Sequence, residues 1–268
     1  MQNTSTAAVK DARATIWAYR ETLKSIEQSH RQGASGSQIL ARITSATDGL
    51  LIDLLDEKAD DLCLHTAELS ERMCLVALGG YGRKEMHPFS DIDVMFLFPE
   101  TPNEKAENLV SGILHALYDA RLQIGNVTHD FASAQAMARE DLPSLTAMLE
   151  GRLIWGNLQH YETFCDQLSK IVRKNRRQLI AGKVAERQER LERYGNTINI
   201  QEPNLKDSPG SLRDYHHGIW LASFMRARKM NLAEMSRVGL LLDREHNDLR
   251  RALEISWRLR NELHWMTG

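Results

Sequence analysis

Two aspartates separated by one apolar residue are the side chains of this chain best suited to chemistry. They lie in the run Ser90-Asp91-Ile92-Asp93-Val94. In a β-strand, residues i and i+2 point to the same face, so the two carboxylates project together while Ile92 and Val94 face the core. Adjacent carboxylates repel each other unless a cation lies between them. Mg²⁺ commonly binds through one or two carboxylates together with substrate phosphates, so the pair predicts a magnesium site.

A pair of glycines precedes these aspartates. Gly79 and Gly80 end the apolar run MCLVALGG, and ten residues separate Gly80 from Asp91. Glycine lets the backbone approach a phosphate closely, and the N–H groups at the start of a following helix favour an anion. Either motif alone is weak, because many strands end in two acids that bind nothing. In this order and spacing, the two motifs favour metal-dependent transfer of a nucleotidyl group from a triphosphate.

The same residues resemble a known enzyme family. Gly79-Gly80 followed by Asp91-Ile92-Asp93 is similar to the glycine–DxD signature of the polymerase-β-type nucleotidyltransferase superfamily. The longer string LGGYGRKEMHPFSDIDVMFLF resembles one branch of it, the PII-protein uridylyltransferases (uridylyltransferase/uridylyl-removing enzymes). A second block, RYGNTINIQEPNLKDSPGSLRDYHHGIWLA at 193–222, resembles a motif of that same branch. The resemblance covers about residues 75 to 268.

The resemblance implies roles for individual residues. Asp91 and Asp93 match the metal-binding acids of the family and are expected to be catalytic. In the second block, Lys206 and Arg213 either neutralise phosphate charge or tie an interdomain loop in place, and the sequence leaves both open. The nucleotide-binding residues that the resemblance implies are Gly79, Gly80, Arg83, Ser90, Lys206 and Arg213.

The third expected strand departs from the family pattern. The superfamily generally places a third carboxylate on a strand beside the first two, where it helps to activate the attacking hydroxyl. Asp130 is the nearest acid, 37 residues after Asp93, and is predicted to be this third catalytic carboxylate. A surface aspartate at the end of a strand is the alternative. His129-Asp130 also spells the HD dipeptide of metal-dependent phosphohydrolases, which we interpret as coincidence.

Hydrophobic periodicity predicts the elements that position these residues. Short apolar runs predict buried strands at 73–80 and 91–98, and a looser alternation predicts a third strand at 121–131. The stretch between the glycines and the aspartates has room for a turn and about two turns of helix. Apolar residues at three-to-four spacing predict helices at both ends of the chain.

These elements predict an α+β fold. We expect a polymerase-β-like nucleotidyltransferase core with a small mixed sheet at 71–135. A helical region at 1–70 precedes it, and a helical domain at 136–268, truncated at its C-terminus, follows it. Relatives of the family are much longer and carry hydrolytic HD and glutamine-sensing ACT domains. The chain is therefore expected to be an N-terminal portion or a shortened relative that adds UMP and does not remove it.

One segment of the C-terminal part is strongly basic. Residues 170–193 contain nine Lys or Arg and three Glu, a local charge of +6 in a chain whose 34 basic and 36 acidic residues give −2. Such a run is usually the solvated face of a helix. A positive surface near the triphosphate or near an acidic partner is the alternative.

Composition excludes several classes of protein. A charge near zero gives no argument for binding nucleic acid or an anionic membrane, and no 18-residue apolar stretch is present. The three cysteines, Cys63, Cys74 and Cys165, are odd in number and widely spaced, which favours the reducing cytoplasm. The N-terminus lacks the pattern of a signal peptide.

The residues and the resemblance together predict one reaction. This is Mg²⁺-dependent transfer of UMP from UTP to a tyrosine of a PII-type nitrogen-regulatory protein, with release of pyrophosphate and with one or two Mg²⁺ ions bound. Two alternatives remain open. One is a transferase of the same fold with another nucleotide or acceptor. The other is a regulatory nucleotide-binding module with weakened catalysis, which the altered third strand permits.

Overall fold

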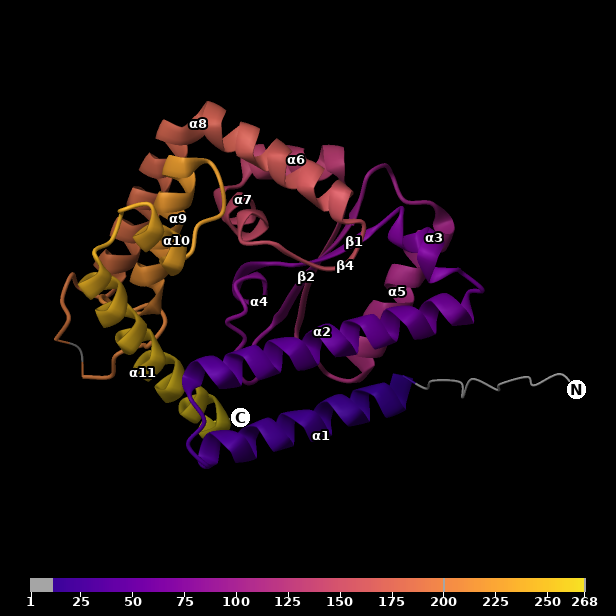
Figure 1. Cartoon of the computed structure of the whole chain (residues 1–268), viewed down its shortest axis with the longest axis horizontal. Coiled ribbons are helices and arrows are strands. Elements are labelled where there is room, and N and C mark those ends of the chain that lie inside the picture. Colours follow the sequence, from indigo (N-terminus) through magenta and orange to yellow (C-terminus); the bar gives the residue numbers. More distant parts are fainter. Residues whose placement is uncertain (1–11, 200, 268) are drawn as a thin grey trace, which may run out of the picture.

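A four-stranded mixed sheet forms the centre of the protein and carries helices on both faces (Figure 1). The computed structural model describes residues 12–199 and 201–267. The strand order is β3-β2-β1-β4; β1 runs antiparallel to β2 and β4, and β2 runs parallel to β3. The strands are β1 (Cys74–Ala77), β2 (Ile92–Phe98), β3 (Ile124–Asp130) and β4 (Arg152–Gly156). The predicted small mixed sheet, with helical regions before and after it, is confirmed.

Two features of the sheet differ from the sequence prediction. The expected helix between the glycines and the aspartates is a single turn, α4 (Gly79–Gly82), followed by an irregular loop up to Asp91. The edge strand β4 lies beyond residue 135, in a region predicted to be entirely helical. Its five residues are only half-buried and stand between two helices, so they show no periodicity from which a strand could be recognised.

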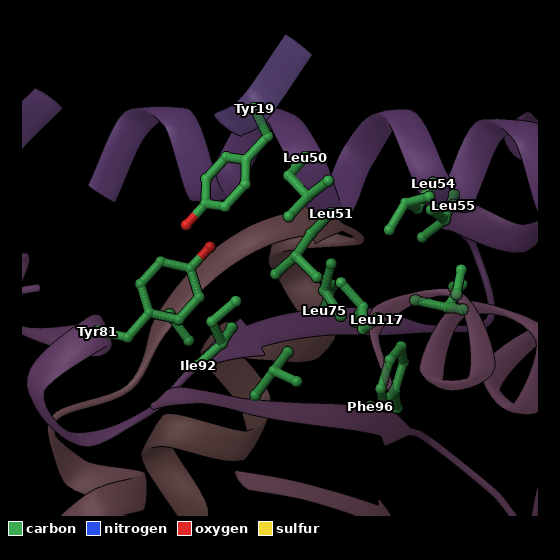
Figure 2. Close-up of a cluster of buried hydrophobic side chains, with 14 of the residues drawn as sticks. Tyr19, Leu50, Leu51, Leu54, Leu55, Leu75, Tyr81, Ile92, Phe96 and Leu117 are labelled. Carbon is green, nitrogen blue, oxygen red and sulfur yellow. The ribbon is translucent and has the colours of Figure 1, made fainter. Parts of the chain in front are cut away.

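Helices α1, α2 and α5 cover one face of the sheet (Figure 2). Leu51, Leu54 and Leu55 of α2 are fully buried there against Leu75 of β1 and Phe96 of β2. Apolar strand residues alternate between the two faces, which places Ile92 and Val94 in this core, as predicted. The bounds of the helices are α1 (Ala12–Arg31), α2 (Gly36–Asp61) and α5 (Glu104–Asp119).

Helices α6, α7 and α8 cover the opposite face. Val76 of β1 and Met95 of β2 pack there with Phe164 of α8. Asp93 lies two residues before Met95 and therefore projects on this same face of the sheet, at the N-terminal end of β2. These helices are α6 (Phe131–Glu140), α7 (Leu142–Leu149) and α8 (Leu158–Arg193).

The C-terminal helix α11 packs against the hairpin that α1 and α2 form at the N-terminal end of the chain. Figure 1 shows α11 crossing toward the beginning of α2. Glu254 accepts a hydrogen bond from the backbone N–H of Gly36, and His30 pairs with Glu262 at 2.8 Å. The remaining helices are α3 (Thr66–Ser70), α9 (Leu212–Arg226), α10 (Leu232–Arg237) and α11 (Asp243–Thr267). None of the helices in the described part of the chain is long and apolar enough to cross a membrane.

Candidate active site

A cleft of about 440 Å³ opens where β2 begins, between the sheet and helices α8, α9 and α11. The acids stand on the sheet side, and residues of the helical domain form the facing wall. The structure thus brings together two sequence blocks that lie more than a hundred residues apart. The predicted residues that line the cleft are Gly79, Gly80, Arg83, Ser90, Asp91, Asp93, Lys206 and Arg213.

The two aspartates share one wall of the cleft. Asp91 is exposed and Asp93 is half-buried. Burial raises the pKa of Asp93, the neighbouring charge of Asp91 raises it further, and the cations Lys206 and Arg83 act in the opposite direction. Ionisation of Asp93 is therefore disfavoured beside the charge of Asp91. A cation bound between the two carboxylates would remove this repulsion.

Both oxygens of the Asp93 carboxylate lie against glycines. A Cβ placed on Gly125 of β3 would stand 2.3 Å from Asp93 Oδ1, and a Cβ placed on Gly79 would stand 3.3 Å from Asp93 Oδ2. Gly125 is the register partner of Asp93 in the parallel pair of strands. A side chain at position 125 would displace the carboxylate, and one at position 79 would crowd it.

The glycine turn presents backbone N–H groups beside these acids. Gly79 adopts φ +50°, in the left-handed region that glycine occupies without strain. The first hydrogen bond of α4 is donated by Gly82 N to Leu78 O at 2.8 Å. The N–H groups of Gly79, Gly80 and Tyr81 precede that bond and have no partner within the helical turn.

Arg83 lies at the cleft but is held by two carboxylates. Its guanidinium donates to Glu85 at 2.8 Å and to Glu150 at 2.6 Å. Glu85 also pairs with His216 of α9 at 2.7 Å, and Glu150 accepts from the Trp220 indole. Burial alone would lower the pKa of Arg83, but the two carboxylates raise it, so its charge is retained and shared within the network. The network fixes the glycine turn against α9, which is a positioning role for Arg83.

The second sequence block contains a loop that is stabilised by hydrogen bonds between its own side chains and backbone. Asn204 Oδ1 accepts from the backbone N–H groups of Lys206 and Asp207, at 2.8 and 2.9 Å. Asp214 Oδ2 accepts from Gly210 N at 2.7 Å, where Gly210 has φ +78°. The loop carries Lys206 to the cleft, and the first turn of α9 carries Arg213 there. The second block therefore both stabilises the loop and supplies cations to the cleft.

A third cation, Arg260 of α11, also faces the cleft. Burial lowers the pKa of Lys206, and the charges of Arg213 and Arg260 lower it further. Within the described residues, the Lys206 ammonium forms no hydrogen bond or ion pair. The sequence reading missed Arg260 because a charged residue on an amphipathic helix has the same pattern whether it faces solvent or a cleft. Three cations that repel one another form a site for a multiply charged anion.

Asp130 does not belong to this cleft, and the prediction that it is the third catalytic carboxylate is wrong. It pairs in register with Phe98, at the far end of the strand from Asp93, about 16 Å away along the sheet. Its side chain caps α6 by accepting from Ser133 N at 2.8 Å. It is the strand-end aspartate of the alternative interpretation.

No other acid takes the place of Asp130 on β3. Gly125 stands opposite Asp93, and Gln123, whose carbonyl accepts from Ile92 N at 2.9 Å, stands at the level of Asp91. Within residues 12–199 and 201–267, no group of three or more His, Cys, Asp or Glu is arranged to hold a metal ion. Two carboxylates in an open cleft nevertheless fit Mg²⁺, which usually keeps several waters and takes its other ligands from substrate phosphates.

Comparisons with known proteins extend over most of the chain. A family model described as GlnD PII-uridylyltransferase matches residues 178–268. A second, described as "Putative nucleotidyltransferase DUF294", matches residues 20–129. The first covers the loop with Lys206 and Arg213, and the second covers the glycine turn and both aspartates. The resemblance to the PII uridylyltransferases is confirmed.

Relatives with this name are considerably longer than the chain. The bifunctional uridylyltransferase/uridylyl-removing enzyme of Novosphingobium aromaticivorans is 35% identical over 198 residues, which are 74% of this chain and 22% of that protein. The enzyme of the same name from Erythrobacter litoralis is 35% identical over 237 residues, 88% of this chain and 26% of that protein. The chain thus spans about a quarter of the length of these uridylyltransferases.

One solved structure also aligns with the chain. It is a toxin–antitoxin structure with AMP-PNP, 22% identical, and the alignment covers 51% of this chain and 95% of that one. The TM-score of 0.28 is too low to establish a common fold.

The basic segment divides into two parts in the structure. Lys183 is buried, donates to Glu186 at 2.7 Å and lies 4.3 Å from the centroid of the Trp220 ring. Arg190 is buried as well, and donates to Asp207 O at 2.6 Å and to the Asp214 carboxylate. The earlier cations, among them Arg173 and Lys174, are exposed. The solvated-face interpretation therefore holds for the exposed cations of the run, including Arg187 and Arg193, but not for Lys183 and Arg190.

Removal of Arg190 should destabilise the protein. Arg190→Met removes the buried cation that, together with Gly210 N and the more exposed Arg187, lowers the pKa of Asp214 against the effect of burial. Breaking such a buried pair costs about 3 kcal/mol in the free energy of unfolding. Arg187→Met is the matched control, because Arg187 contacts the same carboxylate but is 47% exposed, and should cost less than about 1 kcal/mol. Urea denaturation of both variants measures the difference, and a loss for Arg190→Met no larger than that for Arg187→Met would contradict this prediction.

Proposed function

We propose that this chain catalyses the Mg²⁺-dependent transfer of UMP from UTP to a tyrosine hydroxyl of a PII-type nitrogen-regulatory protein, releasing pyrophosphate. The observation that carries the proposal is the pair of opposed walls in one cleft. Asp91 and Asp93 stand on one wall, and Lys206, Arg213 and Arg260 contribute to the other. A nucleoside triphosphate with a divalent cation complements both walls at once.

Each group has a defined task in this reaction. Mg²⁺ bound by Asp91 and Asp93 would act as a Lewis acid toward the phosphate oxygens. The N–H groups of the glycine turn and the ammonium of Lys206 bind the β- and γ-phosphates. The tyrosine oxygen forms a bond to the α-phosphorus, the bond from that phosphorus to the α–β bridging oxygen breaks, and the phenolic proton passes to solvent. Catalysis on this scheme rests on positioning and on neutralisation of charge.

The comparisons support the choice of nucleotide and acceptor. The family model that matches residues 178–268 is described as a PII-uridylyltransferase, and this is the part that supplies Lys206, Arg213 and Arg260. The relatives aligned with most of the chain carry the uridylyltransferase name as well. UTP and a PII-type protein are therefore the substrates that we propose.

One observation favours a second candidate function. The positions on β3 beside the two acids are Gln123 and Gly125, so no third carboxylate is available there to activate the acceptor hydroxyl. A regulatory module that binds the nucleotide with Mg²⁺ and turns over weakly would fit this arrangement.

A transfer assay separates these functions. The chain is incubated with a PII-type protein, Mg²⁺ and each α-labelled nucleoside triphosphate in turn, and both labelled protein and pyrophosphate are measured. We expect label from UTP on a tyrosine, one pyrophosphate per label, and loss of both with EDTA. Label from ATP instead would establish a different transferase. Binding of UTP with Mg²⁺ but without pyrophosphate would establish the regulatory module.

A further inference from the structure

Phe89 combines an exposed ring with a backbone conformation that phenylalanine rarely adopts. The side chain lines the cleft, 61% of the residue is exposed, and its φ is +57°. Ser90 N donates to His87 O at 3.2 Å, which closes a turn with Pro88 in second place and Phe89 in third. A third position with positive φ normally selects Gly or Asn, so an aromatic residue there is an outlier.

Residues on either side of Phe89 hold this turn in place. His87 is buried and pairs through Nδ1 with Asn261 Oδ1 at 2.7 Å, while His264 Nδ1 bonds to Pro88 O. Asn261 and His264 both belong to α11, which also supplies Arg260 to the cleft. The neighbours therefore stabilise the strained conformation, and packing of the Phe89 ring within its own chain contributes little.

Phe89 lies on the segment that leads into the two aspartates, and its exposure places the ring at the open side of the cleft. Phe89, Asp91 and Asp93 all line the cleft, and Gly79 lies against Asp93. Phosphoryl transfer is in line, so the attacking oxygen and the departing pyrophosphate lie on opposite sides of the α-phosphorus. With the β- and γ-phosphates at the glycine turn, a protein acceptor enters from the open side of the cleft, where the Phe89 ring is exposed.

We propose that the Phe89 ring is the contact surface for the aromatic side chain of the acceptor tyrosine. The inference rests on the proposed function and adds to it a residue that selects the acceptor. An exposed ring offers an incoming phenol an offset-stacked or edge-to-face contact, and aromatic pairs of this kind are stabilising beyond the area that they bury. The rigid turn keeps the ring in place before the acceptor arrives, so little conformational freedom is lost on binding.

Three variants of Phe89 test the inference in the same transfer assay. Phe89→Gly removes the ring and accepts the positive φ, Phe89→Ala removes the ring only, and Phe89→Tyr keeps an aromatic ring. We expect Phe89→Gly and Phe89→Ala to raise the KM for the acceptor about tenfold. The affinity for UTP with Mg²⁺ should change less than twofold, and Phe89→Tyr should resemble the wild type.

Each other outcome overturns the inference. Weaker UTP binding with an unchanged acceptor KM would make Phe89 a contact for the nucleoside, and no change in either would make it a surface residue. A defect in Phe89→Ala that Phe89→Gly lacks would trace the effect to the backbone. Absence of transfer by the wild type would overturn the proposed function and this inference together, whereas normal transfer by Phe89→Gly overturns the inference alone.

Discussion

Replacing Asp91 or Asp93 by asparagine should lower the rate of UMP transfer at least about a hundredfold, which corresponds to about 2.7 kcal/mol of lost transition-state stabilisation. Asparagine keeps the shape of the side chain and removes the charge that would hold Mg²⁺ against the phosphates. The effect should appear in kcat and in the affinity for Mg²⁺. Because burial and Asp91 raise the pKa of Asp93, neutralising either acid also removes a repulsion, so the thermal midpoint should not fall.

Asp130→Asn provides the control for this experiment. It removes a carboxylate from the same sheet, and asparagine still caps α6 by accepting from Ser133 N. We expect its activity to stay within about twofold of the wild type. A loss comparable to that of Asp93→Asn would return Asp130 to the catalytic machinery, and near-normal transfer by Asp91→Asn would refute the assigned metal site.

Gly125→Ala should separate catalysis from folding. The added methyl group would lie 2.3 Å from Asp93 Oδ1, so the carboxylate must move away. Asp93 is half-buried, and a small rotation of its carboxylate end costs the fold little, but a displacement of about 1 Å at a reacting centre can cost about a hundredfold in rate. We therefore expect a loss of about that size in UMP transfer with an unfolding free energy within about 1 kcal/mol of the wild type.

Gly49→Ala is the matched control for Gly125→Ala. Gly49 lies within α2, and a Cβ built there meets no atom within 4 Å. This variant should be fully active and somewhat more stable, because alanine favours the helix by about 1 kcal/mol over glycine. Parallel measurements of transfer rate and urea denaturation decide the prediction. If Gly125→Ala is as active as Gly49→Ala, the close contact with Asp93 has no catalytic importance.

Local sequence patterns were sufficient to predict the sheet wall of the cleft. Asp91 and Asp93 share a face because the side chains of a strand alternate, and Gly79 takes a positive φ because its turn requires one. Both effects operate over a few residues, and so they can be recognised in an isolated segment. The third strand marks the limit of such reasoning, since the strand was predicted correctly but its acid was given the wrong role. Asp130 follows Asp93 in the sequence. The parallel register, however, pairs Asp93 with Gly125 and places Asp130 opposite Phe98, at the C-terminal end of β2.

By itself, the sequence determined the two acids, the glycine turn and the second block with Lys206 and Arg213. Only the tertiary structure decided that these lie in one cleft, that Arg83 is held between Glu85 and Glu150, and that Arg260 joins the cations. The physical reason is the range of the interactions. Strand alternation and turn conformation depend on neighbours along the chain. The electrostatics of the cleft depend on segments packed more than a hundred residues away, which no local pattern records.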